Sequence, residues 1–332
     1  MGLKIINSEY DRGAVSKDGT VVGAKGGTEM MQEKINSLDS ELLSKFQIIH
    51  SRVREIDPNK PTILVCHDLA EDPEVLHLGD PKNLEKFAKL VFVSHWQFTT
   101  YNKVLGVPYD NSIVLRNAIK PFAKAQKPHD GPIRLIYHTT PHRGLNILLA
   151  AYQELSKHYG DKIHLDVFSS FKIYGWEQRD EDYKELFKIC EEHPHITYHG
   201  TKPNDEVREA LLKAHIFAYP SIWQETSCIA AIEAMSAGCQ IVCPSYAALP
   251  ETTAGFAYMY PWTSNLHDHA NMFANVLNDA IIEQISLREA GDENPSLAMQ
   301  KLYADSLYSW DNRAVEWEAL LRGILDDQGR SV

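Results

Sequence analysis

Short apolar runs alternate with amphipathic segments along most of the chain, which predicts strands and helices in turn. In the first half, continuous apolar runs predict buried strands at residues 4–7, 62–66, 90–94 and 113–115. Apolar positions at helical spacing predict helices at residues 28–43, 83–90 and 95–105. This order of elements is typical of an α/β sheet with parallel strands.

The alternation starts again after residues 121–131, a stretch rich in proline and lysine that we interpret as an interdomain linker. Strands are then predicted at residues 134–138, 163–168, 196–200, 216–219, 241–243 and 255–258. Helices are predicted at residues 145–155, 176–190, 205–214, 266–285, 295–310 and 312–325. Two such series in one chain predict two doubly wound domains.

Residues 219–243 read YPSIWQETSCIAAIEAMSAGCQIVC and predict the end of a strand, a loop, a helix and a further strand. The helix is expected to open at residues 225–227, where a hydroxyl can act as N-cap, and to end at Gly238. Eight residues of helical rise would separate the carboxylates of Glu225 and Glu233 by roughly 12 Å. That span suits a ligand with hydroxyl groups at two ends, such as a nucleotide sugar.

The helix N-terminus between these carboxylates would attract an anion. In a less specific interpretation, Glu225 only complements the helix dipole and Glu233 faces water. Arg143 lies in a loop that follows a predicted strand, where a guanidinium group can hold phosphate oxygens. The alternative for Arg143 is a surface position with solvent partners.

Two further features of the first half are compatible with a ligand site. His67 directly follows the predicted strand 62–66, and side chains at this position point into the ligand crevice of an α/β sheet. A structural role for this histidine is an equal alternative. Gly26 and Gly27 precede a predicted helix and could approach phosphate closely, although no G-x-G-x-x-G pattern follows the strand.

Composition narrows the range of partners. A formal net charge of -12 over 332 residues argues against nucleic acid as the main partner and against more than peripheral contact with anionic membranes. Five cysteines without zinc spacing indicate reduced thiols in a cytoplasmic protein and no metal site. We find no run apolar enough to span a bilayer and no signal peptide.

The segment PSIWQETSCIAAIEAMSAGCQIV resembles the E-x7-E segment of the retaining glycosyltransferases of family 4. The resemblance implies the GT-B fold, with two Rossmann-like domains facing across a cleft and a C-terminal helix that crosses back to the first domain. The implied divisions are residues 1–120 for the acceptor-side domain, 121–131 for the linker, 132–308 for the nucleotide-sugar domain and 309–332 for the final helix.

The resemblance also implies roles for individual residues. Glu225 would contact the donor sugar, Arg143 the diphosphate, and His67 the region of the transferred sugar. The implied donor-binding residues are Gly26, Gly27, Thr139, Lys172, Gly200, Thr226, Ser227, Cys228 and Glu233. The chain departs from the family pattern at residues 226–228 and 240, and it lacks an arginine where residues 138–140 stand, which Lys172 could replace.

The implied activity is metal-independent, retaining transfer from a nucleoside-diphosphate sugar to the hydroxyl group of a glycan, a lipid-linked acceptor or a small molecule. A UDP-sugar is the favoured donor, no other cofactor is expected, and a homodimer is left open. The alternatives are a sugar-nucleotide epimerase or phosphorylase of the same fold, and a catalytically weak protein that binds sugar nucleotides. Transfer to DNA bases is disfavoured by the acidic charge.

Overall fold

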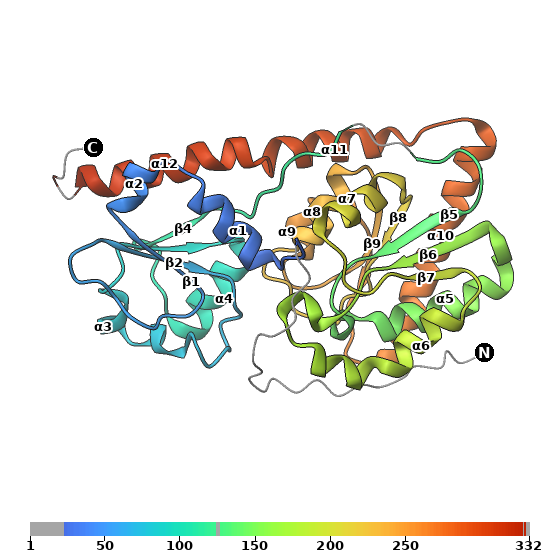
Figure 1. Ribbon diagram of the computed structural model, residues 1–332, viewed down its shortest axis with the longest axis horizontal. Coiled ribbons are helices and arrows are strands. Elements are labelled where there is room, and N and C mark those ends of the chain that lie inside the picture. Colours follow the sequence, from blue (N-terminus) through green and yellow to red (C-terminus); the bar gives the residue numbers. More distant parts are fainter. Residues whose placement is uncertain (1–22, 124–126, 328, 330–332) are drawn as a thin grey trace. The chain divides into compact units, whose positions relative to one another are not determined.

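The computed structural model describes residues 23–123, 127–327 and 329 (Figure 1). Its contacts divide the chain into two compact units. The four-stranded unit comprises the described residues of 27–120, 224–229 and 306–329. The six-stranded unit comprises the described residues of 23–26, 121–223 and 230–305. The strand predicted at residues 4–7 lies outside the described residues.

The four-stranded unit is built on a parallel sheet with the order β1-β2-β3-β4. Its strands are β1 (Gln47–His50), β2 (Thr62–Cys66), β3 (Lys89–Phe92) and β4 (Ser112–Val114). Its helices are α1 (Gly27–Asn36), α2 (Ser40–Ser44), α3 (Pro81–Leu84), α4 (His95–Leu105) and α12 (Trp310–Asp327), with a 3-10 turn η1 (Leu76–Gly79).

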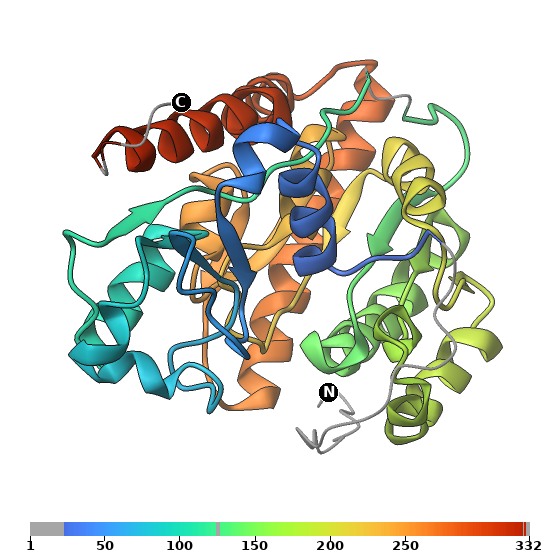
Figure 2. The same ribbon diagram turned by 60° about the vertical axis from the view of Figure 1, so that its left-hand side comes forward.

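Both faces of this sheet are buried, which explains the uninterrupted apolar run of β2. Ile63 and Val65 pack in a cluster with Trp317 of α12. Leu64 and Cys66, which point to the opposite face, belong to a second cluster that includes residues of α4. Figure 2 shows α12, in red, beside α1, in blue.

Three predictions for this unit were wrong in detail. The strand β1 was not predicted. The helix predicted at residues 28–43 is interrupted at Asp39, whose carboxylate accepts the backbone N–H groups of Glu41 at 2.8 Å and Leu42 at 3.0 Å and so starts α2. The helix predicted at residues 83–90 is limited to α3, because the chain is extended in β3 from Lys89.

The six-stranded unit is built on a parallel sheet with the order β10-β9-β8-β5-β6-β7, as in doubly wound nucleotide-binding folds. Its strands are β5 (Ile133–Tyr137), β6 (Ile163–Val167), β7 (Ile196–Tyr198), β8 (Ile216–Ala218), β9 (Gln240–Ser245) and β10 (Tyr258–Pro261). Its helices are α5 (Leu145–Tyr159), α6 (Lys184–Glu192), α7 (Asn204–Lys213), α8 (Ile229–Ser236), α9 (Leu249–Thr253), α10 (Leu266–Ala290) and α11 (Pro295–Leu307). Its 3-10 turns are η2 (Pro141–Arg143), η3 (Gly160–Lys162), η4 (Phe171–Tyr174) and η5 (Glu177–Tyr183).

The helices α5 and α6 lie on one face of this sheet, and α7 and α8 lie on the other (Figure 1). The helix predicted at residues 176–190 is instead a 3-10 segment, η5, followed by α6. The cause is Asp180, whose carboxylate turns back to accept the Ser170 hydroxyl and the Phe171 backbone N–H at 2.7 Å. These two hydrogen bonds tie the loop after β6 to η5.

The helix boundary near the end of the chain also differs from the prediction. It lies at Tyr308 and Ser309, between α11 and α12, whereas the sequence pattern places it at residue 311. Here Ile119 donates its backbone N–H to the carbonyl of Tyr308, and the N–H of Trp310 donates to the carbonyl of Ile119, both at 2.8 Å. The isolated β-bridge between Ile119 and Ser309 therefore uses backbone groups that a continuous helix would pair within itself.

The later part of the predicted linker is packed on the six-stranded unit. The Nζ group of Lys127 is buried, donates to the carbonyl oxygens of Leu211 at 3.0 Å and of Ala214, and lies 3.4 Å from the Sγ atom of Cys239. Burial lowers the pKa of this ammonium group. The segment after residue 126 is thus anchored to the six-stranded unit.

Candidate functional site

The loops that follow β5, β6, β7 and β8 lie along one edge of the six-stranded sheet, because these strands are parallel. The backbone approach is closest at Gly144, which has φ +122°, and where a Cβ atom would lie 2.2 Å from the carbonyl oxygen of Pro220. Ile222 also donates its N–H to the carbonyl of Arg143 at 3.3 Å. Glycine is required at position 144 so that the loops after β5 and β8 can meet.

Four of the predicted site residues come to this part of the unit. Thr139 and Arg143 follow β5, and Gly200, with φ +63°, follows β7. Lys172 lies in η4 after β6, where its Nζ atom pairs with Glu177 at 3.2 Å and both side chains are partly exposed. The ammonium group of Lys172 is therefore engaged on the surface.

Several buried polar atoms at this edge have no hydrogen-bond partner among the described residues. They are His138 Nε2, Thr139 Oγ1, Thr140 Oγ1, Ser169 Oγ and Thr201 Oγ1. These residues follow three adjacent strands, β5, β6 and β7. Because buried polar atoms in folded proteins are nearly always paired, this row indicates that a polar ligand or water binds here.

His138 was not singled out from the sequence. Burial lowers the pKa of its imidazole to about 4, although a hydrogen bond with the backbone of Ala230 opposes the shift. Its ring lies 4.9 Å from that of Phe217. At neutral pH the ring is therefore neutral, and it can offer a hydrogen bond but no positive charge.

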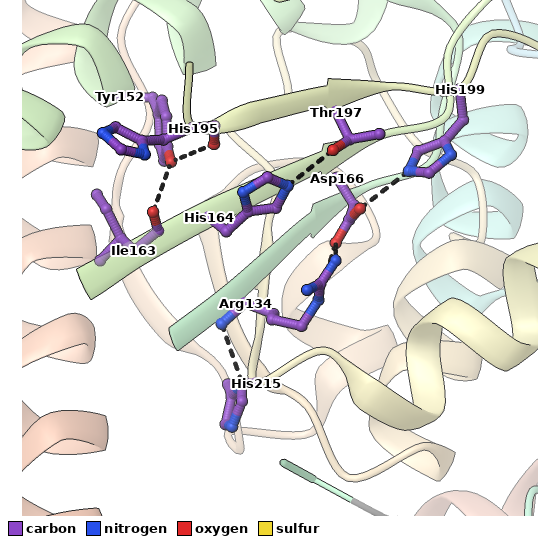
Figure 3. Close-up of polar contacts among 9 residues, drawn as sticks. All are labelled: Arg134, Tyr152, Ile163, His164, Asp166, His195, Thr197, His199 and His215. Atoms are coloured by element: carbon purple, nitrogen blue, oxygen red, sulfur yellow. Dashed lines mark hydrogen bonds and ion pairs between the residues drawn. The ribbon is translucent and has the colours of Figure 1, made fainter. Parts of the chain in front are cut away.

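Asp166 on β6 links the start of β5 to the residue that follows β7 (Figure 3). Its carboxylate accepts from Arg134 on β5 at 2.7 Å and from His199, just after β7, at 2.9 Å. Burial opposes ionisation of Asp166, but the hydrogen bond from His199 and the charge of Arg134 outweigh it and lower the pKa. The His199 ring stacks on Phe168 at 4.1 Å, so the loops that carry Ser169 and Gly200 share one support.

Glu233 lies on α8 and is buried. Its Oε1 atom accepts from Arg208 of α7 at 2.7 Å. The guanidinium group of Arg208 also lies 3.6 Å from the ring centroid of Phe122. Arg208 was missed in the sequence, because a basic residue on a polar helix carries no signal of its partner on another helix.

The prediction that Glu225 opens a helix was wrong. The helix α8 begins only at Ile229, so the distance expected from helical rise does not apply to Glu225 and Glu233. Residues 224–229 have their contacts in the four-stranded unit, where Thr226 Oγ1 donates to the carbonyl of His67 at 3.0 Å. The backbone of this segment follows those contacts and does not continue the helix.

The Glu225 side chain is buried in this segment, with 5% of the residue exposed. Asn117 Nδ2 donates to the carbonyl of Ser227 at 3.4 Å, and Cys228 is also buried. The predicted residues 225–228 and His67 are therefore brought together in the four-stranded unit.

His67 is paired with a second histidine that the sequence interpretation missed. Its Nε2 atom lies 3.2 Å from Nδ1 of His50, and the rings are stacked with an interplanar angle of 14°. Burial, together with the neighbouring His50, lowers the pKa of His67 to about 3, and burial lowers that of His50 to about 4. Both rings are neutral at neutral pH. His50 is the last residue of β1. Because this strand was not predicted, nothing in the sequence was a reason to place His50 beside His67.

Asp68, the residue after His67, was also missed. Its Oδ2 atom is buried and has no hydrogen-bond partner among the described residues. Burial and the nearby Asp72 raise the pKa of this carboxyl group. The four-stranded unit thus has its own cluster of polar side chains, His50, His67 and Asp68, where β1 and β2 end.

The two glycines of the predicted phosphate loop fall in different units. Gly26 ends the stretch grouped with the six-stranded unit, and Gly27 begins α1 in the four-stranded unit. A Cβ atom at Gly27 would lie 3.2 Å from Cδ1 of Ile229. Gly27 therefore allows α1 to pack closely against Ile229, which groups with the same unit.

Comparison with known proteins assigns the family. The family of glycosyl transferases group 1 matches residues 119–290, just over half of the chain. The chain belongs to this family. No curated protein sequence matches it significantly. Within the described residues, no helix is both long and apolar enough to cross a membrane.

Solved glycosyltransferase structures share the fold at low sequence identity. A Rickettsia africae glycosyltransferase has a TM-score of 0.64 and 13% identity, with 90% of this chain and 80% of that chain covered. Anabaena HepE in complex with UDP and glucose has a TM-score of 0.64 and 12% identity, covering 79% and 71%. S. aureus TarM has a TM-score of 0.56 and 14% identity, covering 80% of this chain but only 51% of TarM. The chain thus spans about half the length of TarM.

The predicted fold class is confirmed. The two parallel sheets and the structural neighbours correspond to a GT-B fold with two Rossmann-like units. The family match includes all the loops at the carboxyl edge of the six-stranded sheet and the segment with Glu225.

Proposed function

We propose that this protein is a retaining glycosyltransferase of the family 4 type, which transfers a sugar from a nucleoside-diphosphate sugar to a hydroxyl acceptor. The observation that carries the proposal is the row of unpaired buried polar atoms that follows β5, β6 and β7. These hydroxyl and imidazole groups can hydrogen-bond to a nucleotide at the sheet edge where ligands of doubly wound folds bind. Membership of the glycosyl transferases group 1 family supports a sugar nucleotide as that ligand.

A UDP-sugar is the donor that we propose. UDP is present in the solved structures of TarM and HepE, and we extend this ligand to the present chain as part of the proposal. Arg143, at the end of η2, would contact the diphosphate. The backbone N–H groups of residues 226–228 would assist it as loop amides, because α8 begins only after them.

The two carboxylates of the E-x7-E pattern take separate roles in this proposal. Glu233 would accept the ribose hydroxyls, and Arg208, whose Nη1 atom lies 2.7 Å from Oε1, would hold the carboxylate in its orientation. Glu225 would accept hydroxyls of the transferred sugar and so restrict its orientation. Thr139 and Gly200 would make the remaining contacts with the donor.

The reaction proposed is a substitution at the anomeric carbon with retained configuration. The bond from this carbon to the diphosphate oxygen breaks, the nucleoside diphosphate leaves with the electron pair, and the acceptor oxygen forms the new bond. The acceptor proton passes to an oxygen of the leaving phosphate, so no protein base is required. Arg143 stabilises the charge that develops on the diphosphate, and the neutral His67 hydrogen-bonds without abstracting the proton.

We include in the proposal a metal-independent reaction in the cytoplasm. All five cysteines are buried free thiols, which fits a reducing compartment. The acceptor is proposed only as a hydroxyl compound.

A thermal-stability panel tests the donor site first. A UDP-, GDP-, ADP- or CDP-sugar at about 100 times its dissociation constant adds roughly 2.7 kcal/mol to the free energy of unfolding. We expect stabilisation by a UDP-sugar and loss of this effect in a Thr139→Val, Ser169→Ala double variant, in which valine keeps the shape of threonine and alanine lacks only the serine oxygen. If the UDP-sugar stabilises the double variant as much as it stabilises the unaltered protein, the assignment of the polar row to nucleotide binding is contradicted.

Product analysis then tests the chemistry. Incubation with the stabilising donor and a mixture of hydroxyl acceptors should give a glycoside whose anomeric configuration, read by NMR coupling constants, is that of the donor. Glu225→Gln should abolish the product while the nucleoside diphosphate still binds. A changed sugar nucleotide without acceptor would indicate an epimerase, and an inverted product would contradict retention.

A further inference from the structure

The connection between β8 and α8 is held by three contacts within the four-stranded unit. Thr226 Oγ1 donates to the carbonyl of His67 at 3.0 Å. Asn117 Nδ2 donates to the carbonyl of Ser227 at 3.4 Å. Ile229 lies against Gly27, where a Cβ atom would come within 3.2 Å. Residues 224–229 accordingly group with this unit, although the strand before them and the helix after them belong to the six-stranded unit.

The Thr226 bond is the shorter of the two polar contacts, and it links residues that are 159 positions apart in the sequence. His67 follows the last residue of β2, so its carbonyl lies beyond the sheet ladder, where Thr226 supplies a donor. A threonine side chain is stiff about χ1, so a fixed hydroxyl also fixes its own backbone. That backbone is joined directly to Glu225, which is buried.

We propose that Thr226 is the positioning residue for the Glu225 carboxylate. Its hydroxyl anchors the segment 224–229 to the end of β2, and this anchor sets where Glu225 presents its oxygens to the transferred sugar. The inference rests on the proposed function, since it assigns to Glu225 the sugar half of the donor. The proposed role is selective: the anchor serves recognition of the sugar and leaves recognition of the nucleotide unchanged.

The test compares Thr226→Val, which keeps the shape but removes the hydroxyl, with Thr226→Ser, which keeps the hydroxyl. Thr100→Val is the matched control, because Thr100 also donates to a backbone carbonyl, that of Trp96 at 2.9 Å, within the same unit. Binding of UDP and of UDP-glucose is measured by calorimetry, with GDP and GDP-mannose as a second pair. Amide hydrogen exchange of residues 224–229 is followed without ligand.

We expect Thr226→Val to weaken UDP-glucose binding roughly five-fold, the effect of one lost hydrogen bond. UDP binding should stay unchanged, and exchange at residues 224–229 should become faster. In steady-state assays the donor KM should rise and kcat should fall, because Glu225 no longer holds the sugar. Thr226→Ser should restore both values to within about two-fold, and Thr100→Val should change neither binding nor exchange in the segment.

Two results would overturn the positioning role. Unchanged exchange at residues 224–229 in Thr226→Val would show that the hydroxyl does not anchor the segment. Equal weakening of UDP and UDP-glucose would show a general structural effect without selectivity for the sugar. Absence of binding to every nucleotide by the unaltered protein would overturn the proposed function and the role of Glu225 with it, whereas the exchange data would still report on the anchor.

Discussion

Replacement of Gly144 by alanine should destabilise the protein strongly, because this glycine combines an unusual backbone angle with a backbone contact. At φ +122° an alanine is strained, which costs of order 1–3 kcal/mol. Its Cβ atom would also lie 2.2 Å from the carbonyl oxygen of Pro220 and would have to move to at least 3.0 Å, a shift of about 0.8 Å. Such overpacking costs a further 1–3 kcal/mol or so. We therefore expect a loss of roughly 2–6 kcal/mol in the free energy of unfolding.

Gly291→Ala provides the matched control. Gly291 ends α10 with φ +70°, but nothing lies within 4 Å of the position of its Cβ atom. Only the left-handed strain of about 1–2 kcal/mol applies there. Urea unfolding, followed by tryptophan fluorescence, measures both variants, and the difference between them reports the contact with Pro220 together with any extra strain at φ +122°.

The same substitution should weaken binding at the proposed nucleotide site. Moving residue 144 away from Pro220 displaces η2 and breaks the 3.3 Å bond from Ile222 to the carbonyl of Arg143. We expect Gly144→Ala to lose stabilisation by the donor, whereas Gly291→Ala should keep it. If the two variants lose the same free energy of unfolding, the close approach of the two loops does not exist in solution and the reasoning is refuted.

Three other changes test the remaining parts of the site. Arg143→Ala should reduce kcat by at least 100-fold in a transfer assay, whereas Lys157→Ala, on the exposed surface of α5, should leave the rate unchanged; equal rates in both would remove Arg143 from the reaction. Arg208→Leu leaves the buried Glu233 carboxylate without its 2.7 Å partner. We expect denaturation to show a loss of roughly 2–3 kcal/mol in the free energy of unfolding, and calorimetry to show weaker nucleotide binding. Unchanged stability and binding would contradict the pairing. Asp166 has a lowered pKa in the folded protein, so its stabilising contribution is complete above the ordinary value of about 3.9 and disappears as the pH falls through the folded-state pKa. The difference in the free energy of unfolding between the unaltered protein and Asp166→Asn should therefore shrink below about pH 4. A difference that does not depend on pH would count against the ion pair.

The sequence pattern predicted best where both faces of a strand are buried. The run at residues 62–66 has the bounds of β2, because a strand covered on both faces leaves only apolar residues. The strand β1 reads QIIH and is only half-buried throughout, so its four residues carry little signal. With β1 unrecognised, His50 had no reason to be placed beside His67.

The predicted helix boundaries were wrong where residues from distant parts of the sequence form hydrogen bonds with the segment. At residues 225–228 a good capping pattern predicted a helix start, but Thr226 and Ser227 bond to His67 and Asn117, which lie far away in the sequence. The partner of Glu233 was hidden for the same reason, since only the fold brings α7 and α8 together. The local geometry of the motif residues therefore depends on tertiary contacts that sequence spacing does not encode.

The contribution of α12 to the four-stranded unit has a consequence for biosynthesis. Trp317, Leu321 and Leu325 complete the apolar cluster on the face of the sheet formed by Ile63 and Val65. During translation this face is made about 250 residues before the helix that covers it, an interval of tens of seconds at ordinary elongation rates of roughly 5–20 residues per second. The part of this face that α12 covers must stay exposed or bind a chaperone for that time, while the six-stranded unit can already fold. Ribosome-bound chains that stop before α12 should therefore bind hydrophobic dyes and chaperones, and release of the complete chain should end this binding.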